Sequence, residues 1–454
     1  MRLTTILRLG LRQFAAGLLS VLTLGILNRV MKVEMGLDLT LVSIVISAHY
    51  FAAPLAVPLG HRSDTRPYFV YHRSPYILAG AAITALTTAL APFVAFLMEA
   101  QRGSLLSALV GLGLFLTMGV GMFMAGTAYL SLIADLTTEA ERGKVTGIVW
   151  AMLMFGILAG VFLGTRLLAQ YTPQDLVTLF LTGAVILIAL TLIAIWGLEK
   201  PRPELHAQRE RSRRNAEGPA LSVAEGPRAA LRPSGQAVSL KQAVAVLGGS
   251  GQVRVFFGFL LSGIFFLFVQ QVVLEPFGGD VFGLSVRETT LFNAYQMVGV
   301  LAGMGLGGAW LTRQIGQRQT AALGALVAAA SFGWLALAAL LHQASWLTPA
   351  ILLMGLGMGA FTIAGIALMM GMTVGGHAGL YMGAWTLAEA TARGLAGASG
   401  GVLFDLAQWL GASAAGAYAA VFALEGAGML LTLALLVKVD PVRFRAESAL
   451  AAGR

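Results

Sequence analysis

The chain has 454 residues, of which 57% are hydrophobic and only 11% are charged, and it contains no cysteine. Soluble domains carry about 25% charged residues, so this composition excludes an ordinary soluble enzyme. The absence of cysteine also excludes disulfides and thiolate-bound metals. The net charge of +9 does not indicate nucleic-acid binding, because the basic residues gather between apolar runs in a pattern that fits membrane topology.

The chain contains twelve long apolar runs, six on each side of one basic polar linker. About 20 apolar residues cross a bilayer as a helix, and lipid tolerates only helices or closed barrels. The predicted spans are residues 12–33, 39–60, 75–98, 105–133, 145–169, 176–198, 253–275, 288–310, 319–342, 347–372, 379–403 and 415–438. The sequence therefore predicts an all-α membrane protein with a pseudo-symmetric 6+6 bundle of the major-facilitator type.

Four segments follow from this pattern. They are an N-terminal six-helix bundle at 1–198, a cytoplasmic low-complexity linker at 199–252, a C-terminal six-helix bundle at 253–438 and a cytoplasmic tail at 439–454. The linker repeats Ala-Glu-Gly-Pro amid Arg, Ser and Pro, and such a composition buries no core.

The basic residues fix an expected orientation. Most of the 30 Lys and Arg fall in segments that lie on one side of the predicted spans, whereas Arg29, Lys32, Arg102, Arg166 and Arg287 fall on the other. Cytoplasmic segments carry the excess of Lys and Arg. We therefore expect a multi-pass membrane protein with both termini in the cytoplasm.

Glycines at four-residue spacing form columns in three of the runs, and small residues at this spacing let helices pack closely in lipid. In a 6+6 bundle of this type, the runs 39–60, 145–169, 288–310 and 379–403 meet between the two halves. The columns are Gly156, Gly160 and Gly164, then Gly299, Gly303 and Gly307, then Gly397 and Gly401.

Polar residues at membrane depth are costly and are functional candidates by default. Asn28, Arg29 and Glu34 lie at the predicted outer end of run 12–33, and Gln271 and Glu275 occupy a similar depth in run 253–275. Within one helix, Glu34 is expected to neutralise Arg29 only partly. Both ligand contact and simple anchoring at the membrane interface fit these residues.

Helix 379–403 carries Glu389 and Arg393 one turn apart, which fits either a structural ion pair or a proton-coupling carboxylate. Glu425 has no partner within its own helix, so it is either protonated or paired with a neighbouring helix. His49 is a possible axial ligand for the magnesium of a chlorin, although a lone intramembrane His more often bonds a neighbouring helix. Asn293, with Gln296 on the same run, is a weaker binding candidate.

The segment Gly60-His61-Arg62-Ser63-Asp64 follows the second run and precedes Arg66 and Arg73. It is similar to the Gly-x-x-x-Asp loop with which the major facilitator fold latches its cytoplasmic end. Plain topogenic charge is the alternative. The residues predicted to form this cytoplasmic gate are Gly60, Asp64, Arg66, Arg73, Asp135 and Arg142.

Several segments together resemble the PucC/LhaA family, the bacteriochlorophyll-delivery branch of the major facilitator superfamily. They are 27–34 (Leu-Asn-Arg-Val-Met-Lys-Val-Glu), 60–65, 134–136 with 141–142, 274–279 (Leu-Glu-Pro-Phe-Gly-Gly), and 383–385 with 389–392. The resemblance covers both halves and omits the linker. It implies a non-enzymatic factor of a bacterial inner membrane, cytoplasmic or intracytoplasmic photosynthetic. Such a factor carries (bacterio)chlorophyll as transient cargo to light-harvesting apoproteins, near chlorophyll synthase. The sequence itself indicates no firm resident cofactor or metal site.

The chain departs from the family pattern in the run 379–403. Glu389 stands where the family usually has glutamine, Arg393 where a small residue is usual, and Phe404 replaces a common arginine. A secondary transporter of a small solute or ion, with a carboxylate-coupled mechanism, is therefore the alternative function. A fixed antenna component is disfavoured, because the sequence lacks repeated intramembrane histidines.

Overall fold

The computed structural model describes residues 2–65, 71–168, 171–199, 251–372 and 378–440, which are helical with short connections and form no strand. Within these residues nine helices are long and apolar enough to cross a membrane. The predicted spans 39–60, 288–310 and 379–403 are not among the nine. The first is interrupted, the second carries polar residues such as Glu288 and Asn293, and the third carries Glu389 and Arg393.

The N-terminal half, residues 2–199, begins with one long rod whose outer part has π-helical hydrogen bonding. Its elements are α1 (Leu3–Ser20), η1 (Val21–Leu27), η2 (Val30–Glu34), α2 (Leu39–Ser47), η3 (Ala48–Leu55), α3 (Ala56–Thr65), α4 (Ser74–Ala100), α5 (Leu105–Leu136), α6 (Glu139–Leu167) and α7 (Pro173–Ile195). The rod α1–η1–η2 begins nine residues earlier than the predicted span.

The C-terminal half, residues 251–440, repeats the pattern of long rods with local breaks. Its elements are α10 (Gly251–Phe268), η4 (Val269–Val272), α11 (Leu274–Phe282), α12 (Val286–Leu306), η5 (Gly307–Leu311), α13 (Thr312–Gln314), α14 (Gln317–Leu341), η6 (Ala344–Trp346), α15 (Leu347–Met372), α16 (Ala378–Trp409) and α17 (Ala414–Val437).

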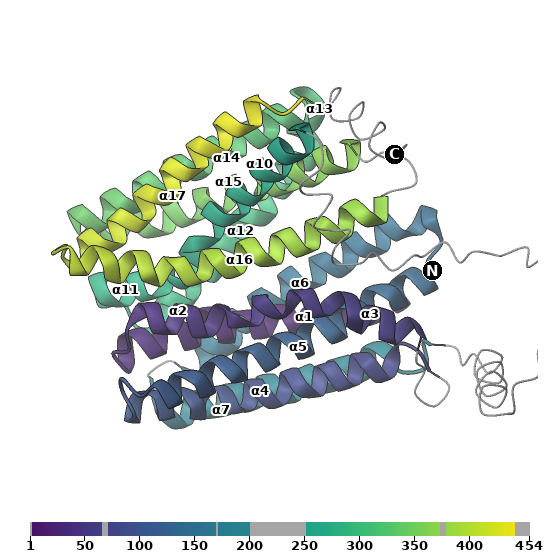
Figure 1. The fold of residues 1–454 in the computed structure, drawn as a ribbon, viewed down its shortest axis with the longest axis horizontal. Coiled ribbons are helices and arrows are strands. Elements are labelled where there is room, and N and C mark those ends of the chain that lie inside the picture. The colour runs from purple at the N-terminus through teal and green to yellow at the C-terminus, as the bar shows by residue number, and fades with distance from the viewer. Residues whose placement is uncertain (1, 66–70, 169–170, 200–250, 373–377, 441–454) are drawn as a thin grey trace, which may run out of the picture.

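The rods run roughly alongside one another, with N-terminal elements on one side of the molecule and C-terminal elements on the other (Figure 1). Between the halves, α2 and η3 pack against α16, and α6 packs against α12. These are the four runs that the sequence places at the seam between the halves. The rod of α1 and η1 also meets α12 and η4 there.

The glycine columns pack closely, but two of the three do so within one half. A Cβ on Gly156 would lie 1.9 Å from the Phe14 carbonyl oxygen, and one on Gly303 would lie 2.1 Å from that of Leu356. The column on α16 does cross the seam, because a Cβ on Gly401 would lie 2.2 Å from the Leu39 carbonyl oxygen. The glycines of α6 and α12 therefore allow close packing mainly within each half, and those of α16 allow it between the halves.

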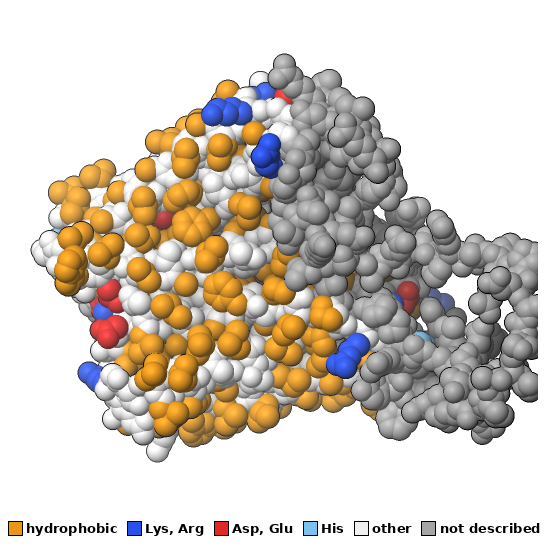
Figure 2. Space-filling model, viewed as in Figure 1, with side chains coloured by type: hydrophobic (Ala, Val, Ile, Leu, Met, Phe, Trp, Pro, Cys, Tyr) orange, Lys and Arg blue, Asp and Glu red, His pale blue; other side chains and the backbone are white. Residues whose placement is uncertain are grey.

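The outer surface between the two ends of the bundle is dominated by hydrophobic side chains, with charged side chains gathered near the ends (Figure 2). Large apolar residues such as Leu86, Phe162, Val185 and Leu337 are more than half exposed. A soluble protein rarely exposes a contiguous apolar surface of this kind. The surface is that of a protein that contacts lipid.

Candidate functional site

The two halves meet at a break in the rod α10–η4–α11, and proline explains this break. Pro276 lies in the first turn of α11 and has no N–H to donate to the carbonyl of Val272 four residues earlier. The side chain of Asn28 takes that place, since its Nδ2 donates to the Val272 oxygen at 2.8 Å. Asn28 is fully buried, so a residue of the N-terminal half completes a helix of the C-terminal half.

Glu425 binds the backbone on the N-terminal side of the same break. The η4 segment leaves the backbone N–H of Gln270 without a helical acceptor, and this N–H donates to Glu425 Oε1 at 2.5 Å. Glu425 is fully buried in α17. The prediction that Glu425 pairs with a neighbouring helix is thereby confirmed for one of its oxygens, whereas Oε2 has no hydrogen-bond partner among the described residues.

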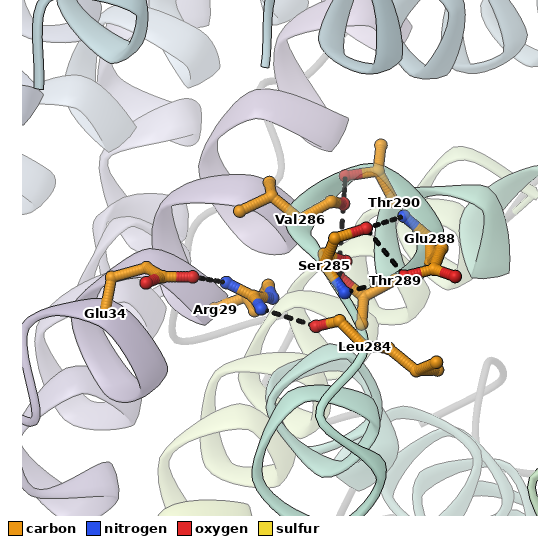
Figure 3. Close-up of polar contacts among 8 residues, drawn as sticks. All are labelled: Arg29, Glu34, Leu284, Ser285, Val286, Glu288, Thr289 and Thr290. Atoms are coloured by element: carbon orange, nitrogen blue, oxygen red, sulfur yellow. Dashed lines mark hydrogen bonds and ion pairs between the residues drawn. The ribbon is translucent and has the colours of Figure 1, made fainter. Parts of the chain in front are cut away.

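Arg29 joins the two halves near the end of the bundle. Its Nη1 lies 2.5 Å from Glu34 Oε1, and its Nη2 donates to the Leu284 carbonyl at 2.7 Å, in the connection between α11 and α12 (Figure 3). Residues five apart face different sides of an ordinary α-helix, which is why the sequence suggests only partial neutralisation. The i→i+5 bonding of η2, with Met35 N–H donating to the Val30 carbonyl, brings the two side chains together.

Glu275 lies against the N-terminal half at the start of α11. Its Oε1 accepts from Asn293 Nδ2 at 2.5 Å, and a Cβ added to Gly25 would come within 2.1 Å of the same oxygen. Only a glycine in η1 allows this approach. Glu275 is 4% exposed and its Oε2 has no partner in the described part of the chain. We call Asn28, Arg29, Glu34, Glu275 and Asn293 the junction cluster.

Two predicted candidates contribute less to this cluster. Gln271 is half-buried in η4, and its side chain makes no hydrogen bond to any other described residue. Gln296, one turn beyond Asn293 on α12, contacts the Met358 sulfur at 3.2 Å, within the C-terminal half. The structure therefore joins Glu275 to Asn293 and Asn28 to the nearby Val272 carbonyl, and it leaves both glutamines outside the cluster.

A second polar centre lies on α16. Arg393 bonds Glu389 Oε1 through Nε at 3.1 Å and Nη2 at 2.8 Å, and its guanidinium carbon lies 3.7 Å from the centre of the Phe268 ring. This geometry fits the structural ion pair and adds a cation–π contact. Phe268 is a partner that sequence reasoning missed, because it lies 125 positions away at the end of α10.

His49 and its aromatic neighbours lie in η3. The Nδ1 of His49 is 2.6 Å from the Ile46 carbonyl, which only accepts, so Nδ1 carries the hydrogen and Nε2 carries a lone pair. The imidazole lies 4.0 Å from the Tyr50 ring, and Tyr50 in turn packs on α16 at Gly394. His49 itself is buried, with its backbone against Gly119 of α5.

The predicted cytoplasmic gate forms contacts within the N-terminal half. Arg73 donates through Nη1 to Ser63 Oγ at 2.9 Å, and its Nε lies 3.3 Å from Asp135 Oδ2. Ser63 Oγ bonds the Gly60 carbonyl at 2.8 Å, so Gly60, Arg73 and Asp135 are brought together. Arg66 and the side chains of Asp64 and Arg142 lie outside the described residues.

Glu199 is a further residue that the sequence analysis did not single out. It accepts from the backbone N–H groups of His72, Arg73 and Ser74 at 2.6, 2.8 and 2.6 Å. These groups begin α4 and have no acceptor in their own helix. Burial alone would raise the pKa of Glu199, but the hydrogen bonds outweigh it and the pKa is lowered. The signal in the sequence is the position of Glu199, a carboxylate directly after an apolar run.

Asp405 makes another contact between the halves. Its Oδ2 accepts from the backbone N–H of Thr40 in the first turn of α2 at 2.8 Å. Next to it, the Lys32 ammonium lies 5.1 Å from the centre of the Phe404 ring. The replacement at position 404 noted in the sequence thus supplies an aromatic face to a cation of the other half.

Comparison with known protein families shows to which family the chain belongs. The PUCC protein family model matches residues 26–444. The chain belongs to the PUCC family. It is 32% identical over 450 residues to an uncharacterized protein in the puhA-bchM intergenic region of Rhodobacter capsulatus, covering 96% of this chain and 88% of that one. It is 30% identical to Protein PucC of the same organism, covering 96% and 92%.

Another relative of this PUCC-family chain is named bacteriochlorophyll synthase 44.5 kDa chain, from Rhodobacter capsulatus, with 29% identity over 88% of this chain and 87% of that one. Solved structures share the fold. A bacterial homologue of the lysosomal transporter Spinster matches with a TM-score of 0.66 at 16% identity, covering 99% of this chain and 98% of that one. The xylose transporter XylE from E. coli matches at 0.65 and 14%, covering 96% and 98%. The fold is that of membrane transporters.

Proposed function

We propose that this chain is a non-enzymatic membrane factor that delivers (bacterio)chlorophyll during assembly of light-harvesting complexes. The observation that carries the proposal is membership of the PUCC family over residues 26–444, together with a relative whose name refers to bacteriochlorophyll synthase. The apolar outer surface supports it, because a chlorin with its hydrocarbon tail is delivered most directly through lipid. The proposed partners are light-harvesting apoproteins and chlorophyll synthase.

The proposed architecture is a twelve-span 6+6 bundle with both termini and the linker 199–252 in the cytoplasm. Its two bundles comprise residues 1–198 and 253–438, and the tail comprises 439–454. The basic residues support this orientation, because they are concentrated in the segments that would then face the cytoplasm.

His49 is the residue that we propose as the axial ligand of the pigment magnesium. Its Nδ1–H is fixed on the Ile46 carbonyl, and a neutral imidazole whose other nitrogen carries the lone pair suits a metal. Tyr50 and Phe51 lie beside Gly394 of α16 and offer aromatic faces at the seam. Since His49 is buried, pigment binding there requires the packing around η3 to open.

The decisive experiment combines a deletion strain with purified protein. We expect deletion to lower the amount of light-harvesting complex while leaving pigment synthesis active. Protein purified in mild detergent should carry chlorin with a characteristic absorption spectrum, and His49→Ala should reduce the bound amount by about tenfold, as removal of a metal-site group does. His342→Ala is the matched control, because that imidazole is exposed in the connection after α14.

A secondary transporter with a carboxylate-coupled mechanism is the second candidate function, and the buried carboxyl of Glu275 favours it. The same preparations separate the two. Two results together would support transport and contradict delivery. They are a pigment-free protein that moves a solute into proteoliposomes and normal antenna levels in the deletion strain.

A further inference from the structure

The junction cluster contains more buried polar atoms than its own members satisfy. Among the described residues, Asn28 Oδ1, Arg29 Nε and Glu275 Oε2 are buried without a hydrogen-bond partner. The amide orientation of Asn28 is fixed, because the Val272 carbonyl accepts and must face Nδ2. Two of the three unpartnered atoms are therefore acceptors, one on each half of the molecule. Buried polar groups that lack partners carry a free-energy cost of about 1–3 kcal/mol each.

The charges of the cluster are unbalanced as well. Its members carry one guanidinium, Arg29, and two carboxyl groups, Glu34 and Glu275. Arg29 is directly paired with Glu34 at 2.5 Å, whereas the direct partner of Glu275 among the described residues is the neutral Asn293 amide. The nearby Lys32 ammonium lies over the Phe404 ring. An ionised carboxylate that is buried without a directly paired cation is disfavoured.

The remaining charged groups around Glu275 do not alter this balance. On its own element, Asp280 accepts from the Tyr418 hydroxyl at 2.6 Å. On α12, Arg287 and Glu288 are exposed, and Glu288 bonds Ser285. On α16, Asp405 is engaged with the Thr40 N–H, and on α17 Glu425 bonds the far side of the helix break at Gln270.

We propose that Glu275 is an exchangeable proton-binding site at the contact between the two halves. A proton on Oε2 turns an unpartnered acceptor into a donor. A proton also needs no cavity, which fits a carboxyl pressed against the Gly25 backbone.

The proton is exchangeable because opposing influences act on Glu275. Burial favours the neutral form. The N-terminus of α11, the Asn293 N–H and the Arg29 guanidinium favour the ionised form. At Glu425 the influences that favour ionisation are weaker. This residue lies in the middle of α17, and among the described residues its partner is one backbone N–H and not a cation. We therefore expect Glu425 to keep its proton, which makes it the control for Glu275.

Infrared difference spectroscopy of the full chain in lipid nanodiscs tests the site directly. We expect a protonated-carboxyl band that disappears as pH is raised, that is absent in Glu275→Gln, and that persists in Glu425→Gln. Asn293→Leu removes a hydrogen bond that favours the ionised form, so the band should persist to higher pH. A titrating band that survives in Glu275→Gln, or one that Asn293→Leu leaves unchanged, would overturn the proposal.

Spin labels report the consequence for the two halves. The chain has no cysteine, so Leu106→Cys and Trp409→Cys place two labels at exposed positions at the ends of α5 and α16. We expect the distance distribution to lengthen or broaden as pH rises, and to stay short at every pH when Glu275→Gln is added. Identical pH responses in both proteins, or recovery of the short distance by sodium but not choline at high pH, would refute a proton site.

Discussion

Arg29 illustrates how one side chain links distant parts of the chain. It reaches Glu34 within its own rod and the Leu284 carbonyl in the other half, and it is 2% exposed. We expect Arg29→Met to lower the free energy of unfolding in detergent by about 3–5 kcal/mol, because loss of one partner leaves a charge and a carbonyl unpaired.

Arg166→Met is the control for this prediction. Arg166 is also cationic and near the end of a helix, but it is exposed, and among the described residues its side chain lies over the Phe162 ring and makes no hydrogen bond or ion pair. Its replacement should change the free energy of unfolding by no more than about 0.5 kcal/mol. Equal effects of the two substitutions would mean that the Arg29 contacts contribute little to stability.

At the scale of elements, the break in the rod α10–η4–α11 is stabilised by a hydrogen bond that the N-terminal half donates. Asn28→Ala leaves the buried Val272 carbonyl without its donor and should cost about 1–3 kcal/mol. In a Pro276→Ala background the new N–H at position 276 reaches the same carbonyl. We therefore expect the cost of Asn28→Ala to fall, which a double-mutant cycle on thermal or denaturant unfolding measures. A zero coupling energy would contradict this account of the break.

The start of α4 depends on Glu199 and so on pH. The pKa of Glu199 is lower in the folded chain than in the unfolded chain, because its hydrogen bonds outweigh burial. Its stabilisation is therefore fully present above the ordinary carboxyl pKa and is lost as pH falls through the lowered value. Glu199→Gln should reduce the loss of thermal stability on acidification, whereas Glu99→Gln, at an exposed carboxylate, should leave it unchanged. A steeper loss in Glu199→Gln would be the contrary result.

The sequence predicts the elements better than it predicts their interruptions. Apolar length and charge placement locate most of the rods. The expected bundle places α2, α6, α12 and α16 at the seam, and the structure adds which of them pair. The π-helical bonding that pairs Arg29 with Glu34 leaves no periodic signal, because it changes which residues share a face. The contact of Asn28 with Val272 spans 244 positions, and local pattern cannot specify such a pair.

For the whole molecule, the orientation in the membrane is open to a direct measurement. Single cysteines at Leu106 and Ala224 can be introduced into a chain that has none. A membrane-impermeant maleimide should label Leu106→Cys in intact cells or spheroplasts and should label Ala224→Cys only after permeabilisation. We expect this pattern because cytoplasmic segments carry the excess of Lys and Arg. The reverse labelling pattern would show the opposite orientation in the membrane.

Hydrogen bonds join the N-terminal half to distant segments of the C-terminal half, and none of these bonds involves the linker. They are made by Asn28, Arg29, Thr40 and Ser43. We therefore expect the two portions to recognise each other without covalent continuity through residues 200–250. Split-protein complementation should succeed: fragments 1–199 and 251–454, made from separate transcripts in one cell, are expected to reassemble and co-purify.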